Sequence, residues 1–145
     1  GTAMRIKQIS VFIENKAGSL SGVCRVLADN GINLRALSIA DTRDFGILRI
    51  IVEDPEKTVE ILKNAGYACK TTYVIAVEID DAPGGMAKAI GTITDAGIEI
   101  EYAYAFVSHR KGSAYMIFRM SHSEESEKKL AASGLRLAGC DELFG

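Results

Sequence analysis

The chain contains two copies of one segment, and this internal repeat constrains its fold more than any other feature. When the sequence is shifted along itself so that Val11 falls on Val77, apolar and glycine positions align without a gap over a long stretch. This constant shift relates the two copies. Identical pairs include Val11 with Val77, Ile13 with Ile79, Gly18 with Gly84, Asp29 with Asp95, Gly31 with Gly97, Ile32 with Ile98, Gly46 with Gly112, and Ile51 with Ile117. Because one shift preserves both the glycines and the apolar rhythm, the sequence predicts two copies of one small fold.

Each copy is predicted to have the element order βαββαβ. In the first copy, alternating apolar residues over 5–13 predict a strand, and the spacing of Leu20, Val23, Cys24 and Leu27 predicts one face of a helix. The further elements are strands at 32–40, 45–52 and 67–71, with a second helix from Pro55 to Gly66. The second copy repeats this order with strands at 73–79, 98–107 and 112–120, helices at 86–97 and 123–134, and a last strand near Leu135. Met86, Ala89, Ile90 and Ile93 are expected to face inward from the first of these helices.

These elements predict an α+β protein made of two ferredoxin-like βαββαβ sandwiches in tandem. The expected domains are residues 4–71 and 72–145. The only expected length change is a short insertion before the second helix of the second copy, and Ser123 is expected to cap that helix.

Composition excludes several classes of function. The 17 basic and 19 acidic residues give a net charge of −2, which argues against a nucleic-acid-binding surface. No apolar run is long enough to span a membrane, and no signal peptide is present, so we expect a cytoplasmic protein without membrane contact. His109 and His122 have no second ligand at metal spacing, so we expect no metal and no cofactor. No nucleophile is paired with a base, and we expect no catalysis.

The candidate site is the turn between the first strand and the first helix of each copy. These turns are residues 14–20 and 80–86, and both contain glycine immediately before a helix. The free amides of a helix N-terminus suit a carboxylate or a phosphate. The plainer interpretation, a tight turn that only caps the helix, stays open at this point.

The sequence after each helix adds context to these turns. Gly31-Ile32-Asn33 follows the first helix, and Gly97-Ile98-Glu99 follows its copy. A strand, a glycine turn, a helix and then Gly-Ile-polar resembles the ACT domain family of small ligand-sensing modules that regulate amino-acid metabolism. The resemblance implies modules that pair side by side into an eight-stranded antiparallel sheet with helices on one face. It also implies an amino acid bound at the module interface.

The resemblance assigns ligand-binding residues to both copies. They are Asn15, Ala17, Gly18, Ser19, Leu20 and Asn33 in the first copy, and Asp81, Pro83, Gly84, Gly85, Met86 and Glu99 in the second. Backbone amides would bind the ligand carboxylate, and the polar side chains its ammonium. Ala17 departs from the family's usual proline, and the second copy has acids at both polar positions. The two sites are therefore not expected to be equivalent.

The chain is expected to form a homodimer, and two arrangements of its modules remain open. The short join at Thr71-Thr72 favours pairing within one chain, in which each site would combine one asparagine with one acid. Pairing of like copies across a homodimer would instead give one site with asparagines only and one with acids only.

The function implied is an amino-acid-binding regulatory protein that is not an enzyme and that acts through an enzyme or regulator partner. The alternative is a ligand-free interaction or regulatory subunit of an amino-acid biosynthetic enzyme. Tyr102, Tyr104 and Phe106 alternate along one strand and are expected to share a face, either for packing or as a pocket wall.

Overall fold

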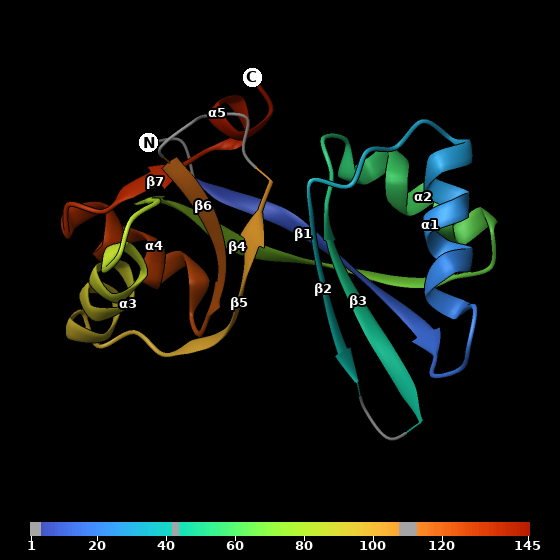
Figure 1. The fold of residues 1–145 in the computed structure, drawn as a ribbon, viewed down its shortest axis with the longest axis horizontal. Coiled ribbons are helices and arrows are strands. Elements are labelled where there is room, and N and C mark those ends of the chain that lie inside the picture. The colour runs from blue at the N-terminus through green and yellow to red at the C-terminus, as the bar shows by residue number, and fades with distance from the viewer. Residues whose placement is uncertain (1–3, 42–43, 108–112) are drawn as a thin grey trace. The chain divides into compact units, whose positions relative to one another are not determined.

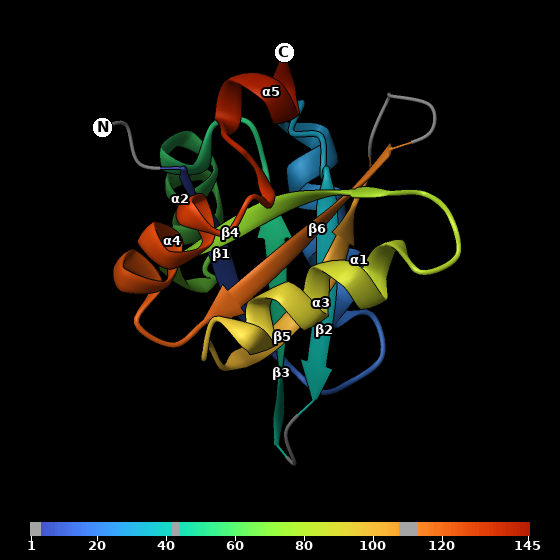
Figure 2. The ribbon, with the colours of Figure 1, turned by 90° about the vertical axis from the view of Figure 1, so that its left-hand side faces the viewer.

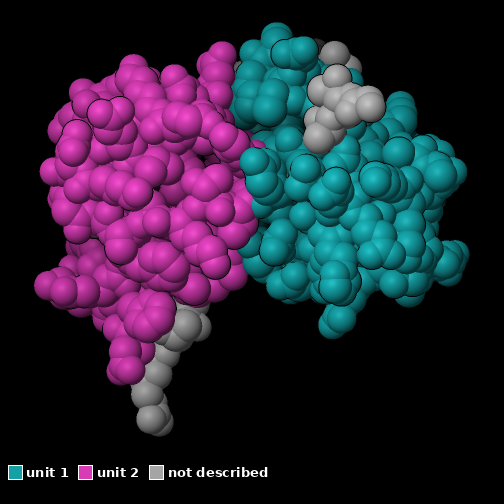
Figure 3. Space-filling model, turned by 180° about the vertical axis from the view of Figure 1, so that it is seen from behind, with its two compact units in different colours: residues 1–6, 73–145 teal, residues 7–72 magenta. Residues whose placement is uncertain are grey.

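The computed structural model describes residues 4–41, 44–107 and 113–145 of the chain. It divides into two compact units: unit 1 is residues 1–6 and 73–145, and unit 2 is residues 7–72 (Figure 3). The domain limits expected from the sequence, 4–71 and 72–145, stay a prediction.

Unit 2 is an antiparallel sheet with two helices on one side (Figure 1). Strand β1 pairs with β3, β3 pairs with β2, and β1 also pairs with β4. This is the strand order of a ferredoxin-like sandwich. The elements are β1 (Arg5–Glu14), α1 (Ser19–Asp29), β2 (Ala36–Asp41), β3 (Phe45–Ile51), α2 (Pro55–Asn64) and the first residues of β4 (Ala68–Asp80).

Unit 1 repeats this architecture. Its antiparallel sheet has the order β5-β6-β4-β7, and α3 and α4 lie together beside it (Figures 1 and 2). The elements after β4 are α3 (Gly85–Asp95), β5 (Ile100–Phe106), β6 (Ser113–Met120), α4 (Ser123–Ala132), β7 (Arg136–Ala138) and α5 (Cys140–Phe144). The expected α+β class with interleaved strands and helices is confirmed.

Each unit has its own apolar core between sheet and helices. In unit 2 the fully buried core includes Ile9 and Leu48 from the sheet and Leu27 and Leu62 from the helices. In unit 1 the buried core includes Ile75, Val77, Ile93, Ile98, Phe118, Met120 and Leu130. Each such side chain contributes about 1.5–3 kcal/mol through burial, so the two cores account for the repeated apolar rhythm.

Two strands differ from the sequence-based expectation. The second strand begins at Ala36 rather than Ile32, because the Ile32 amide donates to the Leu27 carbonyl (2.9 Å) and closes the end of α1. The expected strands 67–71 and 73–79 form one strand, β4, so the described residues hold seven strands and not eight. No glycine or proline interrupts residues 68–80, and β-branched residues there favour continuity.

The insertion in the second copy also lies elsewhere than expected. Ile9 pairs with Ile50 in unit 2, whereas its copy Ile75 pairs with Phe118, two positions beyond the residue that the constant shift assigns to Ile50. Strand β5 still follows the constant shift, since Leu37 pairs with Ile50 and its copy Ala103 with Phe118. The extra residues therefore lie between β5 and β6, ahead of β6, and not directly before α4, the second helix of this copy. The apparent matches of Gly46 and Ile51 arose because an ungapped shift hides an insertion.

Two expectations about helices were also wrong. Ile90 was expected to face inward with Ala89 and Ile93, but its side chain is 39% exposed while theirs are buried. Ser123 is the first residue of α4, and His122, at a φ of 52°, takes the capping position. His109 and Gly112 lie outside the described residues.

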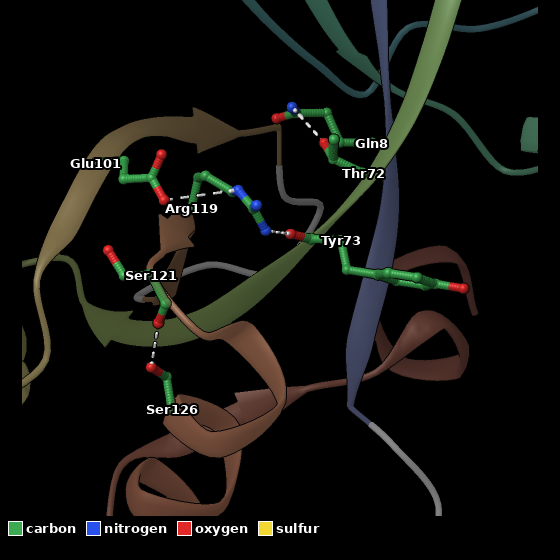
Figure 4. Close-up of polar contacts among 7 residues, drawn as sticks. All are labelled: Gln8, Thr72, Tyr73, Glu101, Arg119, Ser121 and Ser126. Atoms are coloured by element: carbon green, nitrogen blue, oxygen red, sulfur yellow. Dashed lines mark hydrogen bonds and ion pairs between the residues drawn. The ribbon is translucent and has the colours of Figure 1, made fainter.

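Polar contacts tie the strands and helices of each unit together (Figure 4). The buried Ser126 hydroxyl donates to the Ser121 carbonyl (2.7 Å). The buried Thr58 hydroxyl, in the equivalent helix of unit 2, donates to a carbonyl at the start of α2 (2.8 Å). Arg119 donates to the Tyr73 carbonyl (2.9 Å) and lies 3.9 Å from the Glu101 carboxylate.

The expected aromatic face of β5 is confirmed. Tyr102 and Tyr104 stack with ring centroids 6.4 Å apart. Phe106 contacts Tyr115 of β6 and Phe144 of α5 edge to face, at 6.3 and 5.8 Å. Phe106 and Tyr115 are buried, so part of this face packs against α5.

Candidate functional site

In unit 2 the turn between β1 and α1 is shaped by Gly18. Its φ of 88° lies in the left-handed region, and no side chain caps the helix that begins at Ser19. The first intrahelical bond runs from the Gly22 amide to the Gly18 carbonyl (2.8 Å). The Ser19 amide donates to the Lys16 carbonyl of the turn (3.3 Å). The next amides of α1 have no acceptor within the helix, as at every helix start, and carry a partial positive charge.

A pocket of about 590 Å³ lies at this turn, a volume that holds a small molecule. Three of the expected ligand residues, Ala17, Gly18 and Ser19, line it. Asn15 is exposed and is not part of the lining, and Leu20 packs against the apolar core. The complete lining is Phe12, Ile13, Glu14, Lys16, Ala17, Gly18, Ser19, Gly66, Tyr67 and Ala68.

An ion pair provides opposite charges beside the pocket. The Lys16 ammonium lies 2.8 Å from the Glu14 carboxylate. The hydrogen bond and the charge of Lys16 lower the pKa of Glu14, and those of Glu14 raise the pKa of Lys16. Both groups are exposed and stay charged at neutral pH. They match the two charges of a free amino acid.

Asn33 lies in a different pocket of unit 2. That pocket, of about 470 Å³, is lined by Gly31, Ile32, Asn33, Arg35, Glu53, Asp54 and Lys57. Asn33 follows α1, whereas Gly18 precedes it, and 11 helical residues span about 16 Å. Unit 2 therefore does not bring Asn33 to its own turn. The expected contact of Asn33 and Glu99 with a ligand on the other module stays a prediction.

The turn of unit 1 has the same left-handed glycine before its helix but differs at the residue that follows. Gly84 has a φ of 89° and caps α3, while Asp81 and Pro83 are exposed and Met86 is half-buried. A Cβ added at Gly85 would overlap the backbone carbonyl of Asp80. The corresponding residue of unit 2, Ser19, carries a side chain, so the two turns are not identical. Glu99 is exposed, and its carbonyl accepts from the Ser121 amide (3.3 Å).

The sequence interpretation missed the lining residues that lie outside the expected turn: Phe12, Ile13, Gly66, Tyr67 and Ala68. They come from the end of β1 and from the residues around the start of β4, which are far apart in the sequence. The available signal was a comparison of the two copies, because Tyr67 and Ala68 correspond to Leu135 and Arg136 just after the matching glycines.

The described residues hold no group of three or more His, Cys, Asp or Glu side chains that could bind a metal ion. In the same described ranges, every helix is too short or too polar to cross a membrane.

Comparison with known proteins identifies the family. The family model described as an ACT domain pair matches residues 4–142, and the chain belongs to this family. The expected resemblance is confirmed, and with it the assignment to a class of regulatory amino-acid-binding modules. No curated protein sequence matches the chain.

Solved structures support the same fold. Protein BT0572 from Bacteroides thetaiotaomicron is 39% identical over 98% of this chain and 97% of its own length, with a TM-score of 0.88. The ligand-free regulatory subunit of aspartate kinase from Thermus thermophilus is 15% identical over 91% of this chain and 94% of its own, with a TM-score of 0.62. The corresponding subunit from Thermus flavus is 16% identical over 91% of this chain and 94% of its own, with a TM-score of 0.58. The last two show a shared fold.

Proposed function

We propose that this protein is a regulatory sensor that binds a free α-amino acid at the strand-to-helix turn, and that it has no catalytic activity of its own. The observation that carries the proposal is the pocket in unit 2 that joins the start of α1 to the Glu14–Lys16 ion pair. Membership of the ACT domain pair family supports the amino-acid class of ligand.

The chemistry of a zwitterion fits this pocket. The amides after Gly18 and the Lys16 ammonium favour a carboxylate, because both present positive charge. The Glu14 carboxylate accepts hydrogen bonds from an ammonium group. A ligand that contacted this turn would stabilise the module conformation it binds best, and this difference in affinity is the regulatory signal. The output would pass to an enzyme or regulator partner.

Calorimetric titration of the full chain against the twenty amino acids tests the proposal. We expect saturable binding of at least one amino acid and its loss in Gly18→Val, because valine cannot take a φ of 88° without strain. Gly84→Val imposes the same strain on the other turn and is the matched control for reduced stability. Absence of binding throughout, or binding that survives Gly18→Val, contradicts the proposal.

A second function, a ligand-free interaction subunit of a biosynthetic enzyme, is favoured by one observation. Leu37 and Ile39 alternate on β2, share one face and are 40% and 46% exposed. Apolar side chains exposed in this way suit a protein partner. Co-purification of an enzyme that is lost in Leu37→Ser/Ile39→Ser, together with no calorimetric signal from any amino acid, would favour this function over the first.

A further inference from the structure

Beside the turn, the two copies carry different kinds of side chain. The differences lie at the end of the first strand of each copy (β1 or β4) and in the strand that follows its second helix. Gly66 and Gly134 mark equivalent points, since both follow that helix and have φ values of 94° and 90°. Counting on by two positions from these glycines, Ala68 of unit 2 corresponds to Arg136 of unit 1. By the constant shift of the repeat, Phe12 and Glu14 correspond to Glu78 and Asp80.

In unit 2 these positions form the wall of the pocket at the turn. Phe12 and Ala68 line it together with Tyr67. Tyr67 packs against the apolar core, and its hydroxyl lies against α1, where a Cβ added at Gly22 would be 3.1 Å from the hydroxyl oxygen. The absence of a side chain at Gly22 therefore makes room for the Tyr67 ring. The Phe12 and Ala68 side chains are exposed, whereas the Tyr67 ring turns toward the core, so Phe12 and Ala68 form the apolar part of this pocket.

In unit 1 the same positions are occupied by charges that pair with one another. Glu78 and Arg136 are cross-strand partners, with a nitrogen–oxygen distance of 3.8 Å. The Arg136 guanidinium also lies 3.2 Å from the Asp80 carboxylate and donates a hydrogen bond to it. Leu135 replaces the tyrosine and packs into the core. The site that is apolar in unit 2 is thus charged in unit 1.

We propose that one amino acid binds per chain, in the unit 2 pocket, and that its side chain is apolar. This inference rests on the proposed function and names its ligand class. An apolar side chain gains by leaving water for the exposed side chains of Phe12 and Ala68. In unit 1 an apolar side chain would meet the Glu78 carboxylate where unit 2 has Phe12, and it would displace the hydration of the Arg136 guanidinium.

The test transfers the unit 1 residue into unit 2. Ala68→Arg places a guanidinium in the apolar wall within reach of Glu14, as Arg136 is of Asp80. We expect at least a tenfold weaker affinity for apolar amino acids by calorimetry. Thr71→Arg is the matched control, because it adds the same charge at an exposed position of β4 outside the pocket. Its affinity should stay within twofold of the unmodified chain.

Arg136→Ala tests the stoichiometry. It leaves Glu78 and Asp80 without the guanidinium, so unit 1 should still bind no amino acid and the stoichiometry should stay at one per chain. Circular dichroism should show the same folded signal for all variants.

The outcomes separate the inference from the proposed function. Two ligands per chain, a preference for charged amino acids, or unchanged affinity in Ala68→Arg would overturn the inference while leaving amino-acid binding intact. If the unmodified chain binds no amino acid, both the inference and the proposed function are overturned.

Discussion

The same substitution, glycine to alanine, should change stability in opposite directions at two positions. Gly18 has a φ of 88°, and a Cβ added there would meet no atom within 4 Å. Gly18→Ala therefore introduces no clash, and its cost is that of the left-handed backbone, about 1–2 kcal/mol. Reduced freedom of the unfolded chain offsets about 0.4–1 kcal/mol of this. We expect a net loss of about 1 kcal/mol.

Gly91 is the matched position. It lies inside α3 without a left-handed φ, and an added Cβ there would also meet nothing within 4 Å. Gly91→Ala should stabilise the protein by about 0.5–1 kcal/mol, because glycine disfavours a helix interior.

Urea unfolding at neutral pH measures both changes, and calorimetry should show shifts of about 4–8 °C per kcal/mol for a unit of this size. If Gly18→Ala were neutral or stabilising while Gly91→Ala stabilised as expected, the left-handed turn would not exist in solution. If both destabilised equally, backbone conformation would not explain the difference.

Three further predictions follow from single contacts. Gly85→Ala should destabilise the protein by about 1–3 kcal/mol in urea unfolding, since its Cβ would overlap the rigid Asp80 carbonyl; a change below about 0.5 kcal/mol contradicts this. Thr58→Val should cost about 1 kcal/mol by the same assay, because the buried hydroxyl donates to a carbonyl at the start of α2; a stabilising effect argues against that bond. The pKa of Glu14 lies below its usual value because of Lys16. The Glu14–Lys16 ion pair therefore stabilises the fold fully above the unfolded-state pKa of Glu14, and this stabilisation is lost as pH falls through the lower folded-state pKa. In an NMR titration Lys16→Met should raise that pKa, and no change would refute the pairing.

Periodicity and glycine positions predicted most of the fold. Alternation over 5–13 and the spacing of Leu20 to Leu27 are local properties of the chain, and both elements are present. The start of β2 could not be read in this way, because Ile32 and Leu34 pack against the core without belonging to a strand. An apolar residue in a helix-closing loop has the same composition as one in a strand.

The candidate site was predicted only in part, for a related reason. Gly18 and Gly84 could be found because a left-handed turn before a helix requires a particular residue type. Phe12 and Tyr67 line the pocket through the pairing of distant strands, and no residue type is required there. The position of the insertion was hidden for the same reason, since only the register of Ile9 with Ile50 and of its copy reveals it.

The most direct test of amino-acid binding at the unit 2 turn is a two-dimensional amide NMR titration of the full chain with apolar amino acids. The account predicts saturable shifts of the amides of Gly18, Ser19 and Leu20 and of Tyr67, with no comparable shift at Gly84. An unchanged spectrum at millimolar amino acid, or shifts confined to the Gly84 turn, would contradict it.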